Sequence, residues 1–126
     1  MQLSIFIEKV TRNLAINFED TMAVISENYS YTPTQFFNGL NDERLVNEKG
    51  TNEGSCKIFA FAQIHQFSQQ QTLNLFGDFY RVDVLKNPDG VNHQNIRNFM
   101  RFGWAGIAFN GQPLIAKIAQ ATNELY

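Results

Sequence analysis

Apolar residues recur at helical spacing near the start of the chain. The first apolar face is formed by Leu3, Phe6, Ile7, Val10 and Leu14. Because residues three and four positions apart lie on one side of a helix, this spacing predicts an amphipathic helix. Asn17 is expected to cap a second helix. The apolar face of that helix is formed by Phe18, Met22, Ile25 and Tyr29. Pro33 should end it, because the residue before a proline is pushed toward extended geometry.

The middle of the chain predicts two further helices. Residues 55–67 form the third, and its centre from Ile58 to Ala62 is apolar on every side, which is typical of a buried helix. Ser68 and Gln71 make a capping box at the start of the fourth. The apolar face of the fourth helix is formed by Leu73, Phe76, Tyr80 and Val84. Gly77 predicts a bend or a close contact there, because glycine is about 1 kcal/mol worse than alanine in a helix.

The last third of the chain predicts a fifth helix and a closing one. Asn92 is expected to cap the fifth helix and Gly103 to end it. The core side of this helix is formed by Ile96, Phe99 and Met100. The closing helix is predicted from the apolar positions Leu114, Ile115, Ile118, Thr122 and Leu125.

Two Phe-Asn-Gly segments predict strands and turns. Gln35 to Phe37 is followed by Asn38-Gly39, and Ile107 to Phe109 by Asn110-Gly111, and Asn-Gly is the strongest short hairpin signal. Residues 41–54 read as a polar loop with a short strand at Leu45-Val46. The predicted fold is therefore α+β, mainly α, with five or six helices around a Phe-rich core. A small antiparallel sheet is expected from the two short Asn-Gly hairpins.

Composition narrows the class of protein. A chain of 126 residues with 44% hydrophobic residues predicts a single domain spanning 1–126. The net charge of −2 argues against nucleic-acid binding, and the single cysteine excludes an internal disulfide. No apolar run is long enough for a membrane span, so we expect no membrane partner. Asn and Gln number 24 against 12 acidic residues, and this weakly charged surface favours weak self-association.

Several runs of the sequence resemble one protein family. They are Tyr31-Thr32-Pro33, Asn52 to Gln63, Leu75-Phe76-Gly77-Asp78, Asn87-Pro88-Asp89-Gly90, His93 to Arg97 and Gly103-Trp104-Ala105-Gly106. Over roughly residue 1 to Leu114 the chain resembles the HopJ type III effector family, which implies a bacterial source but supplies no established activity or ligand. Secretion signals of this type are usually flexible and polar, whereas a helical pattern begins here at Leu3. We therefore expect a resident cytoplasmic protein.

Cys56 is the first candidate for chemistry. It is expected in the first turn of the third helix, where the helix dipole can lower a thiol pKa. His93 or His65 would serve as its base, with Asp89 or Asn95 orienting the imidazole. The competing interpretation is a small buried core residue, which is the common fate of a free cysteine.

A cationic stripe is the second candidate. His93, Arg97 and Arg101 recur every fourth residue, and Trp104 follows. Arginines one turn apart beside an indole predict a site for an anionic, partly flat molecule. The glycines on both sides of Trp104 leave room for a close approach. In the competing interpretation the arginines pair with Asp78, Asp83 or Asp89, and Trp104 fills the core.

Two further readings are disfavoured. Asp78, Asp83, Asp89 and His93 lie within sixteen residues, but their spacing is not that of a zinc site, so we expect neither a metal nor a cofactor. The many phenylalanines lie on predicted helices without interleaved basic residues, which favours a core over a base-stacking surface.

The functional expectation is a non-catalytic binding or interaction domain. Its partner would be a protein or a small anionic ligand bound by Arg97, Arg101, Trp104 and His93. The alternative is a cysteine-dependent hydrolase or transferase that uses Cys56 with His93 or His65. The position of the Cys56 sulfur separates the two, because a nucleophile and its base must come within hydrogen-bond reach.

Overall fold

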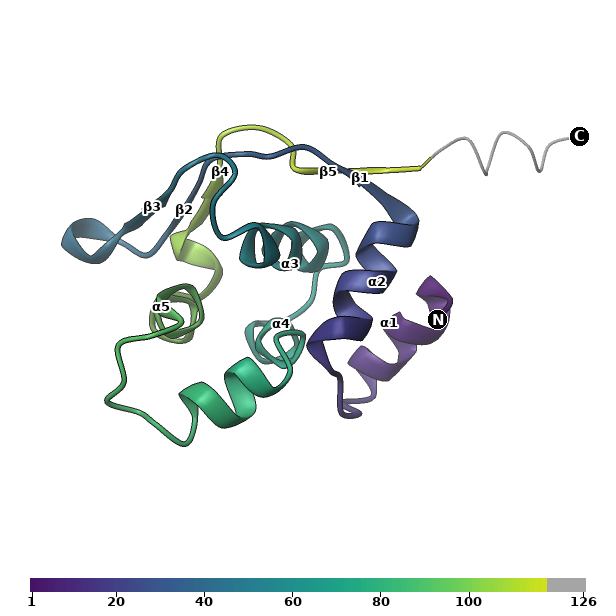
Figure 1. Ribbon diagram of the computed structural model, residues 1–126, viewed down its shortest axis with the longest axis horizontal. Coiled ribbons are helices and arrows are strands. Elements are labelled where there is room, and N and C mark those ends of the chain that lie inside the picture. The colour runs from purple at the N-terminus through teal and green to yellow at the C-terminus, as the bar shows by residue number, and fades with distance from the viewer. Residues whose placement is uncertain (118–126) are drawn as a thin grey trace, which may run out of the picture.

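The structure is a computed structural model that describes residues 1–117 (Figure 1). Within these residues the helices are α1 (Leu3–Thr11), α2 (Phe18–Asn28), α3 (Glu53–Ile64), α4 (Gln69–Asn74), α5 (Gln94–Phe102) and a π-helix (Phe79–Val84). Two 3-10 turns cover Asn41–Glu43 and Gly103–Gly106. The strands are β1 (Tyr29–Tyr31), β2 (Phe36–Asn38), β3 (Leu45–Asn47), β4 (Ile107–Phe109) and β5 (Leu114–Ala116). The predicted mainly helical α+β class is confirmed.

The strands form two small antiparallel sheets along one side of the molecule, at the top of Figure 1. In the larger sheet β2 lies between β3 and β4, with Phe36 opposite both Asn47 and Phe109. The two Phe-Asn-Gly segments therefore share one sheet, as predicted. Only the first of them leads into a hairpin. After Asn110-Gly111 the chain crosses to the second sheet, where β5 pairs with β1.

The predicted closing helix is wrong at its start. Leu114 to Ala116 form β5, because Leu114 is buried in the core while the main chain pairs with Tyr29 to Tyr31. The rest of that prediction, from Ile118 onward, lies outside the described residues. The same pairing explains why α2 ends at Asn28 and why Tyr29 belongs to a strand.

The core is built on phenylalanine around α3, which lies beneath the strands and among the other helices (Figure 1). Every residue of α3 from Ile58 to Ala62 is buried, as its all-round apolar pattern predicts. The Phe59 ring is the hub, with its centroid 4.9 Å from Phe99, 5.6 Å from Phe76 and 6.1 Å from Phe36. Aromatic pairs at these distances add about 0.5–1.5 kcal/mol each beyond their buried area.

The predicted fourth helix is interrupted. The capping box at Ser68 is present, but α4 ends at Asn74 and the chain turns at Gly77, whose φ is +63°. The π-helix follows and carries the remaining apolar positions, Tyr80 and Val84. A bend at Gly77 was the expectation, and it is confirmed.

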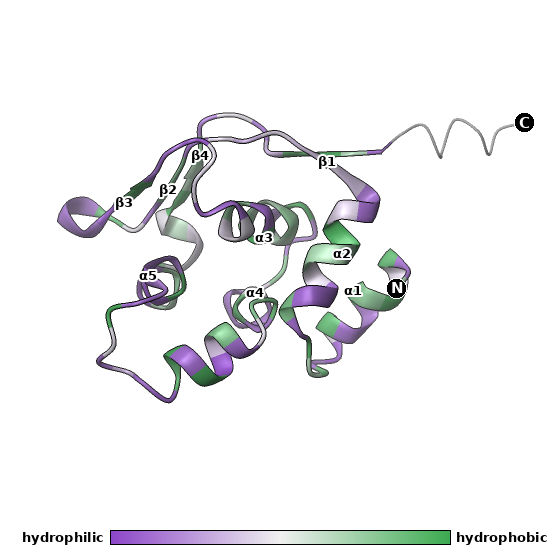
Figure 2. Ribbon diagram, in the orientation of Figure 1, coloured by the Kyte–Doolittle hydropathy of each residue, from purple (hydrophilic) through white to green (hydrophobic). Residues whose placement is uncertain are grey.

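Helix α5 begins one residue later than predicted. Its N-cap is His93, which has a left-handed backbone, and not Asn92. The Asn92 side chain instead accepts a hydrogen bond from Arg97 Nη2 at 2.9 Å. Figure 2 shows most of α5 as hydrophilic, yet Asn95 and Asn98 are buried. This helix therefore packs through side-chain amides as well as through Ile96 and Phe99.

Candidate functional site

A cavity of about 490 Å³ lies between the start of α3 and the start of α5. Its polar lining residues are Asn47, Asn52, Ser55, His93, Gln94 and Asn95. Its apolar lining includes Phe18, Leu45, Phe76, Phe79 and Ile96. This volume is in the range of small-molecule sites, which combine an apolar wall with a few convergent polar groups.

Two helix N-termini meet at this cavity. The N-caps of α3 and α5 are Asn52 (φ 49°) and His93 (φ 51°), both left-handed, and neither gives a side-chain cap to its helix. The hydrogen bonds to the N-cap carbonyls are the first of each helix: Cys56 N–H donates to Asn52 O in α3, and Arg97 N–H donates to His93 O in α5. The N–H groups of the first turns are therefore left for solvent or a ligand, and they favour negative charge.

His93 is held from the π-helix side. Its Nε2 lies 3.0 Å from Asp83 Oδ2, and the Phe79 ring lies 5.3 Å from the imidazole, centroid to centroid. The side chain of His93 is 29% exposed and that of Asp83 42% exposed. Asp83 does not line the cavity but a smaller adjacent one of about 220 Å³, together with Glu19 and Asp78. His93 thus lies between an acidic hollow and the cavity.

A network of side-chain amides forms the floor of the cavity. Asn95 Nδ2 donates to Asn47 Oδ1 at 2.8 Å, and Asn47 Nδ2 donates back to Asn95 Oδ1 at 3.1 Å. Asn52 Nδ2 donates to Asn47 Oδ1 at 2.8 Å, and Asn38 Nδ2 donates to Asn95 Oδ1 at 3.0 Å. These bonds fix the start of α5 against β2 and β3, so the polar wall is preorganised.

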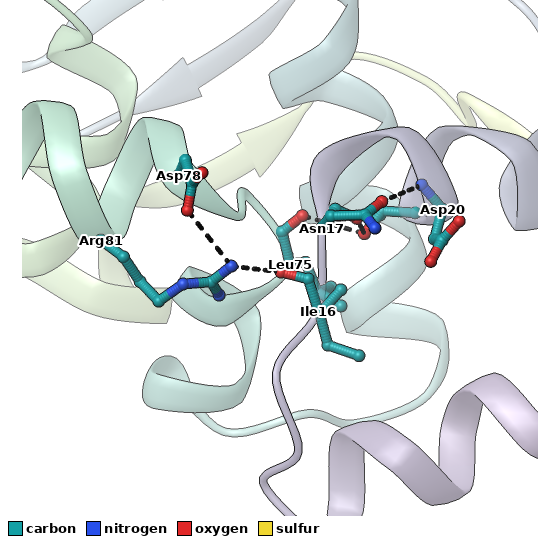
Figure 3. Close-up of polar contacts among 7 residues, drawn as sticks. Ile16, Asn17, Asp20, Leu75, Asp78 and Arg81 are labelled. Atoms are coloured by element: carbon teal, nitrogen blue, oxygen red, sulfur yellow. Dashed lines mark hydrogen bonds and ion pairs between the residues drawn. The ribbon is translucent and has the colours of Figure 1, made fainter.

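Phe18 and Phe79 form the wall between the cavity and the acidic hollow, since both line both spaces. Their rings meet edge to face with centroids 4.9 Å apart. The two segments that carry them are tied by hydrogen bonds (Figure 3). Arg81 Nη2 donates to Ile16 O at 2.6 Å, and Thr21 Oγ1 donates to Leu75 O at 2.9 Å.

Figure 3 also shows the cap of α2, where Asn17 Oδ1 accepts from Asp20 N–H at 2.7 Å. This cap was predicted from the sequence. It fixes the first turn of α2, and therefore the backbone of Phe18, beside the cavity.

The predicted cationic site is not assembled as expected. Arg97 and Arg101 line a different cavity of about 320 Å³ with Leu85 and Met100. Trp104 lines a third space, with Gln63, Gln66 and Phe67. His93 lines the main cavity. Arg97 and Arg101 therefore share one pocket, as residues one turn apart on a helix should, but the other two residues do not join them. Trp104 lies in the 3-10 turn after α5, and His93 is the left-handed N-cap before its first turn.

Both arginines are held by other parts of the protein. Their partners are not Asp78, Asp83 or Asp89, the acids that the competing interpretation named. Arg97 donates from Nε to Asn92 O at 2.6 Å and from Nη1 to Asn87 O at 2.9 Å, so its guanidinium closes the loop before α5. Arg101 forms a bidentate ion pair with Glu43, with Nη2 2.8 Å from Oε2, and this pair lowers the pKa of Glu43.

Trp104 is half-buried and belongs partly to the core. Its Nε1 donates to Phe67 O at 3.0 Å, and its ring meets Phe99 edge to face at 5.1 Å. The indole is therefore held in place by the protein itself.

Cys56 lies in the first turns of α3, as predicted, but its environment opposes activation. The residue is fully buried, and its Sγ donates to Thr34 O at 3.7 Å. Burial raises the pKa of Cys56 to about 11. The interpretation of Cys56 as a small buried core residue is therefore confirmed, and the activated thiol of the alternative is not found, because burial disfavours the charged thiolate.

Neither histidine is placed as a base for Cys56. His65 Nε2 is bonded to Tyr29 Oη at 2.7 Å, within a cluster that includes Phe61 and Phe67. His93 is bonded to Asp83. Asn95, expected as an orienting group for a catalytic histidine, belongs to the amide network.

Two negative findings concern residues 1–117. No group of three or more His, Cys, Asp or Glu side chains is arranged to hold a metal ion there. Of the four residues considered for a metal, Asp83 and His93 contact each other and Asp78 pairs with Arg81 at 3.6 Å. In the same part of the chain, no helix has the length and apolar character needed to cross a bilayer.

Sequence reasoning missed most of this site. The sequence pattern indicates no functional role for Asn47, Asn52, Ser55 or Gln94, and it indicates Asp83 only as a metal ligand or an arginine partner. The available signal was the position of Asn52 and His93 directly before two helices, because Asn and His tolerate the left-handed backbone better than most residues.

Comparison with known proteins places this geometry in a family. Residues 3–114 match the family model described as HopJ type III effector protein. The chain is also similar to the crystal structure of a protein of unknown function, VPA0580, with a TM-score of 0.87 and 47% sequence identity. That similarity covers 93% of this chain and 95% of the other. No curated protein sequence matches the chain.

Proposed function

We propose that this chain, which belongs to the HopJ type III effector protein family, is a non-catalytic binding domain that holds a small anionic ligand in the cavity between α3 and α5. The observation that carries the proposal is the convergence of two helix N-termini without side-chain caps on one cavity of about 490 Å³. Main-chain N–H groups at helix starts are ready-made donors for carboxylate or phosphate oxygens.

The lining supports a ligand with a polar end and an apolar end. The polar residues Asn52, Ser55 and Gln94 lie at the helix starts. The apolar part of the lining includes the rings of Phe18, Phe76 and Phe79. An aromatic carboxylate has this division of polarity. The amide network beneath the polar wall favours binding, because groups already held in place lose little freedom when a ligand arrives.

The placement of the thiol supports binding over covalent catalysis. Cys56 is buried with a raised pKa, and both histidines have partners other than sulfur. A nucleophile and its base need to be within about 3 Å of each other and accessible to substrate.

Titration with benzoate, followed by amide NMR, tests the proposal. We expect shifts for residues 53–55 and 94–96 in the first turns of α3 and α5. The blocking variant is Ser55→Asp, which places a carboxylate among the same N–H groups and should abolish the shifts while leaving the helix stable. Its matched control is Ser68→Asp, because Ser68 caps α4 at an exposed position and Asp is an equally good cap.

The proposal predicts binding by wild type and Ser68→Asp, and loss of binding in Ser55→Asp. Two results would overturn it. One is the absence of shifts in the first turns of both helices with benzoate and with sulfate. The other is equal binding by the Ser55→Asp and Ser68→Asp variants.

A further inference from the structure

We propose that His93 couples anion binding to proton uptake, so that the cavity binds its ligand more tightly as pH falls. This inference rests on the proposed function, since it concerns the same cavity. It begins from the lining of the cavity. Among the described residues that surround the cavity, His93 is the one with an ionisable side chain.

Asp83 sets which ring nitrogen of His93 carries the proton. An ionised carboxylate only accepts hydrogen bonds, so Nε2, at 3.0 Å from Asp83 Oδ2, must be the N–H. In neutral His93 the proton is therefore on Nε2, and Nδ1 is a lone pair. Among residues 1–117 no donor is bonded to Nδ1. A neutral His93 thus offers an anion no N–H group of its own.

Protonation reverses this situation. It adds a second N–H on Nδ1, which can donate to an anionic oxygen, and it neutralises the charge of the Asp83–His93 pair. Charge-assisted hydrogen bonds of this kind are about twice as strong as neutral ones. An anion in the cavity should therefore favour protonated His93, and by reciprocity protonation should favour the anion.

The other charged groups around His93 do not supply this coupling. On the π-helix, Arg81 is bonded to Ile16 O and paired with Asp78. Glu19 of α2 faces the acidic hollow with Asp83, and Glu53 lies in the first turn of α3. On α5 itself, Arg97 is bonded to the preceding loop, where Asp89 is exposed. The remaining neighbours are acids, so His93 is the group left to gain positive charge.

The first measurement is the tautomer of His93 in the free protein. Nitrogen-15 chemical shifts of the imidazole at about pH 8 should show a protonated Nε2 and a bare Nδ1. An Nδ1–H tautomer would overturn the inference without bearing on whether the cavity binds anions.

The second measurement is the affinity for sulfate and for benzoate at about pH 5.5 and pH 8, where both anions keep a constant charge. We expect binding to be on the order of tenfold weaker at the higher pH, a difference of about 1.4 kcal/mol. His93→Asn should remove the pH dependence, and Asn tolerates the left-handed backbone at this position.

Asp83→Asn and Asp78→Asn form a matched pair, because each removes one negative charge from the acidic hollow and only Asp83 contacts His93. Asp83→Asn should tighten anion binding at pH 8, because the new amide no longer fixes the proton of His93 on Nε2. The ratio of the affinities at pH 5.5 and pH 8 should therefore become smaller. Asp78→Asn should keep the wild-type ratio of affinities at the two pH values.

Two results would overturn the coupling. One is equal anion affinity of the wild type at both pH values, and the other is a His93→Asn variant that keeps the wild-type ratio of affinities. Absence of binding at both pH values would overturn the proposed function and with it the coupling.

Discussion

The side-chain amides of Asn47 and Asn95 bind each other reciprocally, at 2.8 Å and 3.1 Å, and link the end of β3 to the first turn of α5. Asn47 is 4% exposed and Asn95 7% exposed, so water cannot easily replace either partner. Buried polar groups that lose a partner cost about 1–3 kcal/mol each. The pair is therefore structural support for the cavity above it.

Replacing Asn95 by alanine should lower the free energy of unfolding by about 3 kcal/mol. The substitution leaves Asn47 Nδ2 without its acceptor and removes one of the two acceptors of Asn38 Nδ2, which keeps the main-chain oxygen of residue 95 at 2.8 Å. Urea denaturation measures the loss. The control is Asn110→Ala, since Asn110 is exposed and bonded to Gln35, and it should change stability by less than about 0.5 kcal/mol. Equal effects of the two variants would contradict a buried network.

Cys56 should not react with iodoacetamide in the native protein at neutral pH. With the pKa raised to about 11 by burial, roughly one thiol in ten thousand is ionised at pH 7. Mass spectrometry of the alkylated protein checks this, and labelling in about 6 M urea serves as the positive control. Rapid labelling of the folded chain would restore the cysteine-dependent enzyme as a candidate.

His65 should make the protein less stable in mild acid. Burial lowers the pKa of His65 from its ordinary value of 6.5, so the unfolded chain binds the proton more readily than the folded one. The stabilisation that comes from keeping His65 neutral is fully present above pH 6.5. It is lost as pH falls through the lower pKa that His65 has in the folded protein. Urea midpoints between about pH 7.5 and 5 measure it.

His65→Gln is the comparison for this effect, because a glutamine amide can still form a hydrogen bond with Tyr29 Oη but carries no titratable group. The variant should show a smaller fall of the midpoint than wild type. Parallel pH profiles for the two proteins would mean that His65 contributes nothing to the acid sensitivity.

The sequence predicted the elements whose causes are local. The Asn17 cap, the Ser68–Gln71 capping box and the stop at Gly103 each depend on a few neighbouring residues, and each is present. The all-round apolar run of α3 likewise identified the buried helix at the centre of the core.

The features that depend on distant contacts were not predictable in this way. Leu114 to Ala116 fit a helical pattern but form β5, because their partners on β1 lie more than eighty positions earlier in the chain. The amide network joins Asn38, Asn47 and Asn95 across three elements, and amides carry no periodic signal. The cationic stripe had regular spacing, yet spacing on one helix does not say which cavity each residue meets.

Gly77 lies directly against the backbone that carries Phe18. A Cβ atom at position 77 would come within 2.7 Å of Phe18 N and 3.2 Å of Asn17 Cα, and the φ of Gly77 is +63°. Two costs therefore apply to any side chain here. One is the strain of a left-handed backbone, about 1 kcal/mol, and the other is a clash with main-chain atoms that cannot rotate away.

Gly77→Ala should lower the free energy of unfolding by more than about 2 kcal/mol and weaken benzoate binding, because Phe18 must move and it lines the cavity. Gly50→Ala separates the two costs. Gly50 also has a positive φ, +87°, but a Cβ there would meet nothing within 4 Å, so only the backbone strain remains. We expect it to lose about 1 kcal/mol and to bind benzoate like wild type. If the two variants lose the same stability, the contact between Gly77 and Phe18 does not position the cavity wall.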